Sequence, residues 1–142
     1  MNMMISYQEL VRTFLSMNGK MDLAAFQRLV ERTRSIDGEA FIICHDVNGT
    51  VKFELIDTMR IPTTGNRIFD DGSYVSNGIH FDRYGKVIEY YVTRLNPSTY
   101  TYQTGDYEVI PASNILHLMI QDYPNQERGI PDIIAGVMLP TY

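Results

Sequence analysis

Residues 77–92 have the sequence NGIHFDRYGKVIEYYV, in which two apolar runs are separated by a short polar segment. Both runs, residues 78–82 and 86–92, are rich in the β-branched and aromatic residues that favour strands. The connector, residues 82–85, has the composition of a type I turn closed by a glycine in the left-handed region. This segment therefore predicts an antiparallel hairpin.

Similar strand patterns lie on both sides of this hairpin. Residues 40–45 and 51–56 are joined by Asn48-Gly49, which is a strong hairpin signal. A further pair of short strands is expected at residues 107–110 and 114–119. The polar segments between them are predicted to be loops. They are Thr58–Asn77 and Asn96–Asp106.

The N-terminal third predicts two helices. The first is expected to begin at Ser6, which has capping-box spacing with Glu9, and to end at Asn18-Gly19. The second is expected to begin at Asp22 and to end at Asp37-Gly38. Apolar residues recur at helical spacing in both. They are Leu10, Val11, Phe14 and Leu15, then Leu23, Phe26, Leu29 and Val30.

The predicted fold class is α+β, with two N-terminal helices packed on a mainly antiparallel, hairpin-built sheet. The length of 142 residues suits a single domain over residues 1–142. Residues 1–37 are expected to be helical, residues 38–120 to form antiparallel strands and loops, and residues 121–142 to start a following helical region. The apolar run at residues 133–139 lacks a polar last turn, so we expect the chain to be a fragment of a longer protein.

Composition and charge exclude several classes of protein. Cys44 is the single cysteine, so an internal disulfide and a cysteine-rich zinc site are ruled out. Apolar runs are much shorter than the roughly 20 residues that span a bilayer, so no membrane partner is expected. The formal net charge is −5, and the 12 Lys and Arg residues are scattered singly. Such a chain can line a DNA passage but is not expected to bind phosphates tightly.

Two groups of residues carry potential catalytic or metal-binding chemistry. Cys44-His45-Asp46 contains a nucleophile, a base and a carboxylate, but adjacent strand residues point to opposite faces of a sheet. His80 and Asp82 share a strand face and could bind a metal with His45 or His117 as a third ligand. Three isolated histidines do not have the spacing of a metal site. The expectation is therefore a structural role for both groups.

Two glycine-containing segments have a weaker resemblance to ligand-binding loops. Asp70-Asp71-Gly72 resembles the start of a calcium loop, but no alternating acidic pattern or terminal glutamate follows it. Gly65 and Gly72 fit no nucleotide-binding motif. The sequence therefore predicts no catalytic residue, no metal ligand, no cofactor-binding residue and no enzymatic activity.

Three ordered segments resemble the lambda-type portal proteins of tailed bacteriophages. The first is the helix containing residues 26–30 with the turn DGEAFI at residues 37–42, and the second is the hairpin 77–92. The third is VIPASNILHL at residues 109–118, closed by QERGIP at residues 126–131. The family has YGR and AY where this chain has Tyr84-Gly85-Lys86 and Glu89-Tyr90. The resemblance covers roughly residues 21–140.

The resemblance implies a structural role in a phage or prophage. Portal subunits form a ring, typically a dodecamer, at one capsid vertex, and the matching part is the N-terminal wing region. The implied partners are other copies of the chain, the terminase large subunit, and the capsid and head–tail completion proteins. Double-stranded DNA would pass through the channel without sequence-specific binding. The implied locations are the portal vertex of the virion and, during assembly, the cytoplasm of the bacterial host.

Two alternatives remain open from the sequence. One is a small metal-dependent hydrolase or nuclease module that uses His45, His80 and Asp82. The other is a cellular protein-interaction domain that shares these hairpins. In the portal interpretation, Thr58–Asn77 and Asn96–Asp106 are candidates for contacts with other subunits or with the capsid, although ordinary solvated loops are an equally good interpretation of both.

Overall fold

The computed structural model describes residues 16–137, which form two compact units. Within the described residues, the first unit contains residues 16–56, 116–120 and 129–137. The second unit contains residues 57–115 and 121–128. The chain therefore leaves the first unit after β2 and returns to it twice.

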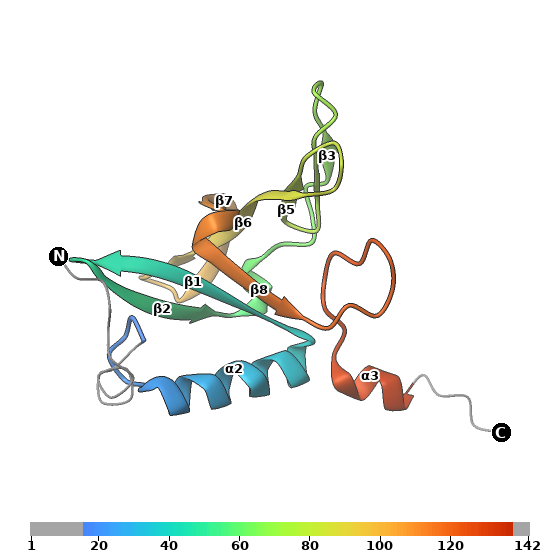
Figure 1. Cartoon of the computed structure of the whole chain (residues 1–142). Coiled ribbons are helices and arrows are strands. Elements are labelled where there is room, and N and C mark those ends of the chain that lie inside the picture. Colours follow the sequence, from blue (N-terminus) through green and yellow to red (C-terminus); the bar gives the residue numbers. More distant parts are fainter. Residues whose placement is uncertain (1–15, 138–142) are drawn as a thin grey trace. The chain divides into compact units, whose positions relative to one another are not determined.

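The first unit is a three-stranded sheet with one long helix. Its strands lie in the order β2-β1-β8, with β1 at Glu39–Val47, β2 at Thr50–Ile56 and β8 at Ile115–Met119. Helix α2, Leu23–Asp37, lies along this sheet (Figure 1). It buries Phe26, whose ring centroid lies 6.0 Å from that of Phe53 on β2. The short helix α3, Asp132–Val137, follows.

Helix α2 begins and ends at the residues that the sequence predicts. The Asp22 carboxylate accepts a hydrogen bond of 2.9 Å from the backbone N–H of Ala25, as an N-cap residue does. At the other end Gly38 has φ 90°, and its N–H donates to the Arg34 carbonyl at 2.8 Å. A residue with a side chain is strained in this left-handed conformation, so a glycine ends the helix.

The second unit is a five-stranded antiparallel sheet in the order β3-β4-β5-β6-β7. Consecutive strands pair with one another, so the sheet is a series of hairpins. One face supplies a buried core that includes Ile79, Phe81 and Val92. The strands are β3 at Arg67–Ile68, β4 at Tyr74–Ser76, β5 at Ile79–Phe81, β6 at Val87–Asn96 and β7 at Thr101–Pro111, with 3₁₀ turns at Thr58–Arg60 and Ala112–Asn114.

The turns and loops of the structure can be compared directly with those predicted from the sequence. The predicted turn at residues 82–85 is confirmed, because the Gly85 N–H donates to the Asp82 carbonyl at 3.0 Å and Gly85 has φ 88°. The Asn48-Gly49 hairpin is confirmed as well, with both residues at positive φ. The predicted loop at residues 58–77 is wrong in part, because it contains β3 and β4. The predicted loop at residues 96–106 is also wrong in part, because β7 begins at Thr101.

The predicted fold class is wrong in two respects. Within residues 16–137, the N-terminal third contributes one helix, α2, and the strands form two separate sheets rather than one. The first predicted helix was expected to continue to Asn18. Ser16 instead forms a β-bridge with Phe53, and the Met17 N–H donates to the Phe53 carbonyl at 2.8 Å. The backbone bonds of this segment therefore go to β2, and the rest of that helix, residues 6–15, lies outside the described residues.

We predict that Asp22→Ala lowers the free energy of unfolding by about 1 kcal/mol, because the first turn of α2 loses its side-chain acceptor. Urea denaturation followed by circular dichroism measures the change. Arg28→Ala, at an exposed position on the same helix, is the matched control and should change stability by much less. Equal effects for the two variants would contradict the assigned N-cap.

Candidate functional site

The structure does not bring Cys44, His45 and Asp46 together as a catalytic set. His45 Nε2 lies 2.9 Å from Glu54 Oε1 on β2. The Asp46 carboxylate instead accepts from the Gly49 N–H at 2.8 Å, within the hairpin turn. Burial raises the pKa of the Cys44 thiol, which disfavours the thiolate that a nucleophile needs. Each of the three side chains thus has a structural partner or setting.

Asp82 and His80 also have separate roles. Asp82 Oδ1 accepts from the backbone N–H groups of Lys86, at 2.9 Å, and Tyr84, at 2.8 Å. The bond from the Lys86 N–H is the main cause that lowers the pKa of Asp82, and both bonds hold the turn. His45 and His117 belong to the first unit, and His80 belongs to the second. Within residues 16–137, no group of three or more His, Cys, Asp or Glu side chains is placed to hold a metal ion.

The Asp70-Asp71-Gly72 segment is a turn organised by Asp71. Asp71 Oδ1 accepts from the Ser73 hydroxyl at 2.6 Å and from the Ser73 backbone N–H at 2.9 Å. The hydroxyl bond is the main cause that lowers the pKa of Asp71. This carboxylate therefore closes the turn that leads into β4.

One arrangement that sequence reasoning missed has the order of contacts of a catalytic triad. Ser73 Oγ lies 3.1 Å from His80 Nε2, and His80 Nδ1 lies 2.9 Å from Glu89 Oε1. However, Ser73 is 5% exposed, and its hydroxyl also lies 2.6 Å from Asp71 Oδ1. A carboxylate can only accept, so the hydroxyl proton points to Asp71 and is not available to the imidazole. The arrangement is therefore a structural network.

The segments that carry the family resemblance meet at Glu39 in the first unit. Glu39 is 3% exposed, and its Oε2 accepts from the Gly129 N–H at 2.9 Å and lies 2.7 Å from His117 Nε2. The His117 ring stacks on Phe41, with centroids 4.2 Å apart. A buried carboxylate is stable only when it is paired and hydrogen-bonded. Glu39 therefore joins β1, β8 and the residues before α3.

The backbone at Gly129 passes directly over the backbone at Gly38. A Cβ on Gly129 would lie 2.6 Å from the Gly38 carbonyl carbon and 2.8 Å from the Glu39 Cβ. A Cβ on Gly38 would likewise lie 2.8 Å from the Ile130 backbone nitrogen. All three distances are shorter than the contacts that real Cβ atoms make, so the crossing requires two glycines. Residues 37–39 (DGE) and residues 128–131 (RGIP), both part of the family resemblance, thus contact each other here.

Arg128, the residue before this crossing, binds backbone carbonyls of the second unit. Its Nη1 donates to the carbonyl oxygens of Asn77 at 3.0 Å and Ile61 at 3.1 Å, and its Nη2 donates to that of Thr58 at 3.4 Å. A guanidinium presents five donors in a fixed planar array, so one side chain can hold several backbone carbonyls. Arg128 thereby ties the start of the second unit to the Asn77-Gly78 turn.

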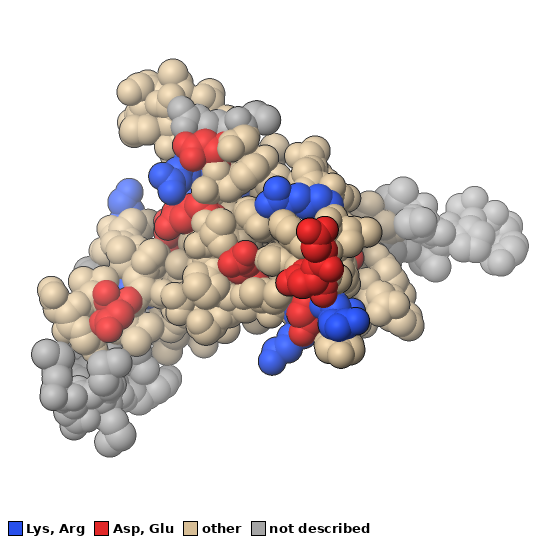
Figure 2. Space-filling model, turned by 90° about the horizontal axis from the view of Figure 1, so that it is seen from above, with Lys and Arg blue, Asp and Glu red and all other residues tan. Residues whose placement is uncertain are grey.

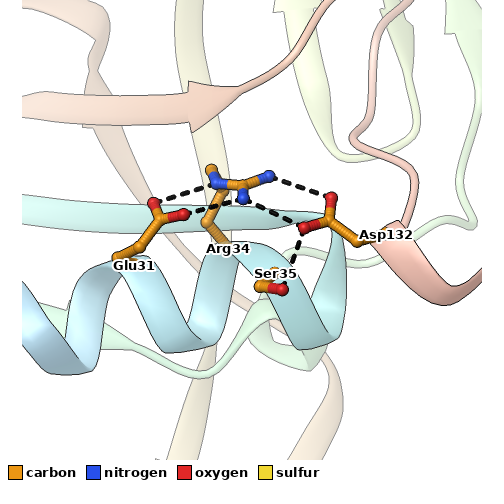
Figure 3. A network of polar contacts seen from close by, with 4 residues as sticks. All are labelled: Glu31, Arg34, Ser35 and Asp132. Carbon is orange, nitrogen blue, oxygen red and sulfur yellow. Dashed lines mark hydrogen bonds and ion pairs between the residues drawn. The ribbon is translucent and has the colours of Figure 1, made fainter.

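A polar network attaches α3 to α2 in the first unit (Figure 3). The Arg34 guanidinium donates to both carboxylate oxygens of Glu31 and to both of Asp132, and the Ser35 hydroxyl donates to Asp132 at 2.9 Å. The bonds to Arg34 are the main cause that lowers the pKa of Glu31 and of Asp132. They raise the pKa of Arg34 in return. Asp132 is the first residue of α3, where a carboxylate also interacts favourably with the helix dipole.

We predict that Gly129→Ala lowers the free energy of unfolding by about 2 kcal/mol or more, because the added methyl group collides with the Gly38 backbone. Gly65→Ala is the control. Its Cβ meets nothing within 4 Å, so only the strain of a positive φ, about 1 kcal/mol, is expected. Chemical denaturation of both variants measures the difference, and a smaller loss at Gly129 than at Gly65 would contradict the close crossing.

The network at α3 predicts a pH dependence with a definite sign. A carboxylate whose pKa is lowered by folding stabilises the fold at neutral pH, and that contribution is lost as the pH falls through the lowered pKa. We therefore expect the attachment of α3 to weaken only in acid, below about pH 4. Carboxyl-carbon NMR should place the Asp132 midpoint below 3.8. In Arg34→Gln the midpoint should move up towards that value, and an unchanged midpoint would argue against the network.

Comparison with known protein families gives a match, and it includes the segments that contain Glu39 and Arg128. A model of the family described as "Phage portal protein, lambda family" matches residues 6–140. None of the curated proteins compared with the chain matches it. Portal proteins of this kind are structural, assemble with copies of themselves and with packaging and capsid proteins, and occupy the portal vertex of the virion. The chain belongs to the lambda family of phage portal proteins and is a structural component of the head–tail connector ring through which phage DNA is packaged and ejected.

Proposed function

We propose that this chain is the wing part of a portal subunit and that it contributes contacts between subunits without catalysis. The observation that carries the proposal is the Glu39 junction. At this junction His117 and the Gly129 N–H, which lie in two segments typical of the family, both contact the buried carboxylate of Glu39. A side chain committed to such a tie holds the fold and is not available for binding a substrate.

The proposal that the chain is not an enzyme is supported by the partners of its candidate residues. The Ser73 hydroxyl donates to Asp71, and Asp82 and Asp46 accept backbone N–H groups in turns. The Cys44 thiol is raised in pKa by burial. The raised pKa disfavours the nucleophilic thiolate of Cys44, and the serine proton and the aspartate oxygens already take part in hydrogen bonds within turns.

The proposed partners are further copies of the chain in a ring, typically a dodecamer, together with the terminase large subunit and the capsid and head–tail completion proteins. Double-stranded DNA would pass without sequence-specific contacts. In support, the formal net charge is −5, and acidic and basic side chains lie in small neighbouring groups on the face shown in Figure 2. No helix within residues 16–137 is long and apolar enough to cross a membrane. Assembly is proposed to take place in the host cytoplasm.

Two segments of the second unit are the proposed contact surfaces. Ile68, in the segment 58–77, is 83% exposed, and Tyr100, in the segment 96–106, is 81% exposed. Aromatic and other large apolar side chains that are almost fully exposed offer a partner apolar surface to cover, and aromatic residues are enriched in the buried centres of interfaces. Heterologous contacts of this kind close into a ring when the rotation between subunits allows it.

We also propose that the chain is part of a longer subunit and that residues 121–142 begin the helical region that follows the wing. Whole portal subunits of the type that the chain resembles are several times longer. The short helix α3 at Asp132–Val137 supports the start of a helical segment there.

The test is expression of the complete gene that encodes these residues, followed by negative-stain electron microscopy. We expect rings with a central hole. A full-length protein that remains monomeric under several buffer conditions would contradict the proposal.

The contact surfaces are tested in the same protein by Ile68→Thr and Tyr100→Asn. Threonine suits a strand, and asparagine suits the positive φ of 53° at position 100, so both variants should fold. We expect the double variant to reduce the yield of rings by roughly tenfold, as loss of an interface anchor does. Tyr84→Asn is the matched control, because Tyr84 is 85% exposed but lies outside both segments. Equal loss in the control would refute the assignment of these surfaces.

A further inference from the structure

An apolar groove lies in the first unit between helix α2 and the edge strand β8. We refer to it as the α2–β8 groove. Its volume is about 320 Å³, and its apolar lining includes Leu23, Phe26 and Val30 of α2 and Leu116 and Leu118 of β8. Two polar residues of α2 also lie on it. They are Gln27 and Glu31, and the Glu31 carboxylate is paired with Arg34. The groove therefore offers a ligand mainly apolar surface.

The two faces of β8 differ in how well they are covered. On one face Ile115 is buried, and His117 stacks on the buried ring of Phe41. On the other face, which lines the groove, Leu116 is 47% exposed and Leu118 is 40% exposed. Side chains alternate between the faces of a strand, so both leucines present apolar area on the same side. An adjoining set of exposed apolar side chains of this kind marks a surface that a further segment covers.

The described chain begins at the opposite edge of the same sheet. Ser16 forms a β-bridge with Phe53 of β2, and Phe53 itself lines the groove. Because β1 pairs with the other side of Phe53, Ser16 lies on the outer side of β2. The Ser16 hydroxyl accepts from the backbone N–H groups of Met21, at 3.0 Å, and Lys20, at 3.2 Å. The point at which residues 1–15 join the first unit is therefore fixed.

The length of the preceding segment matches the width of the sheet. From Ser16 across β2 and β1 to β8 there are three strand spacings, or roughly 14 Å. Residues 6–15 lie outside the described residues, and their sequence predicts a helix, which would be about 15 Å long. Its apolar face would consist of Leu10, Val11, Phe14 and Leu15. A segment of this length can reach from Ser16 to β8 and place apolar side chains there.

We propose that the α2–β8 groove is the docking site for residues 6–15 of the same chain. The apolar face predicted for this segment covers Leu116 and Leu118, and its polar face remains towards the solvent. Direct attachment at Ser16 gives the segment a high effective concentration at the groove, so it is favoured over the same segment of another copy. The other end of the chain approaches elsewhere, because α3 is attached at Arg34, near the C-terminal end of α2. This inference does not depend on ring assembly.

The test uses tryptophan fluorescence of the 142-residue chain, which contains no tryptophan of its own. Leu10→Trp places the probe on the predicted apolar face of residues 6–15, and Thr13→Trp places it on the polar face. We expect the emission of Leu10→Trp to be blue-shifted and its quenching by acrylamide to be several-fold weaker than that of Thr13→Trp. Equal quenching of the two variants would overturn the proposal.

Substitutions in the groove show where the probe is bound. Added to Leu10→Trp, Leu116→Lys should shift the emission to the red and restore quenching. Leu118→Thr, which suits a strand, should act in the same direction and serves if Leu116→Lys does not fold. Val109→Lys is the matched control, because Val109 is a strand residue that is 46% exposed but lies in the second unit. If the groove variants leave the emission of Leu10→Trp unchanged, the segment does not dock there.

Dilution distinguishes the same chain from a second copy as the source of the segment. Docking within one chain predicts an emission maximum of Leu10→Trp that is independent of protein concentration. A blue shift that is lost on dilution, together with a decrease in mass measured by light scattering, would assign the groove to a neighbouring copy and overturn the proposal.

Discussion

The buried carboxylate of Glu39 is the constraint on which the first unit depends. A carboxyl group that is 3% exposed is tolerated only when it has hydrogen-bond partners, and two of its partners come from distant parts of the chain. His117 arrives on β8, and the Gly129 N–H arrives just before α3. The order of strands in the sheet, the path of the returning chain and the two-glycine crossing are all conditions for pairing this one group.

The same logic applies to the other pairs of histidine and carboxylate side chains in the described residues. Histidine and carboxylate pairs occur at His45, His80 and His117, and each pair joins two strands. In a catalytic site such a pair would be aimed at a substrate. Here the remaining hydrogen-bonding capacity of Ser73 and Asp82 is used by neighbouring backbone or side chains, so polar chemistry serves to position strands. Hydrogen bonds between strands of this kind would help a connector to keep its shape while DNA moves through it.

Local patterns in the sequence predicted the local structure well. Asp22 and Gly38 bound a helix, and the turn at residues 82–85 forms as expected, because these features depend on neighbouring residues alone. The division of the strands into two sheets was not predictable, because alternation shows which residues share a face but not which strands pair. The sequence predicts that Gly78 begins a strand, whereas in the structure Asn77 and Gly78 both have positive φ and form a turn. The Ser73–His80 contact could have been found only from the register of three strands.

The position of Gly129 has a consequence for how the chain is made. Glu39 must wait for partners that lie 78 and 90 residues further along the sequence. On a ribosome, α2 and β1 therefore emerge long before these hydrogen-bonding partners of the carboxylate, and most of the second unit is synthesised in between. The first unit can close only when the returning segment has left the exit tunnel, so we expect its last residues to complete its folding.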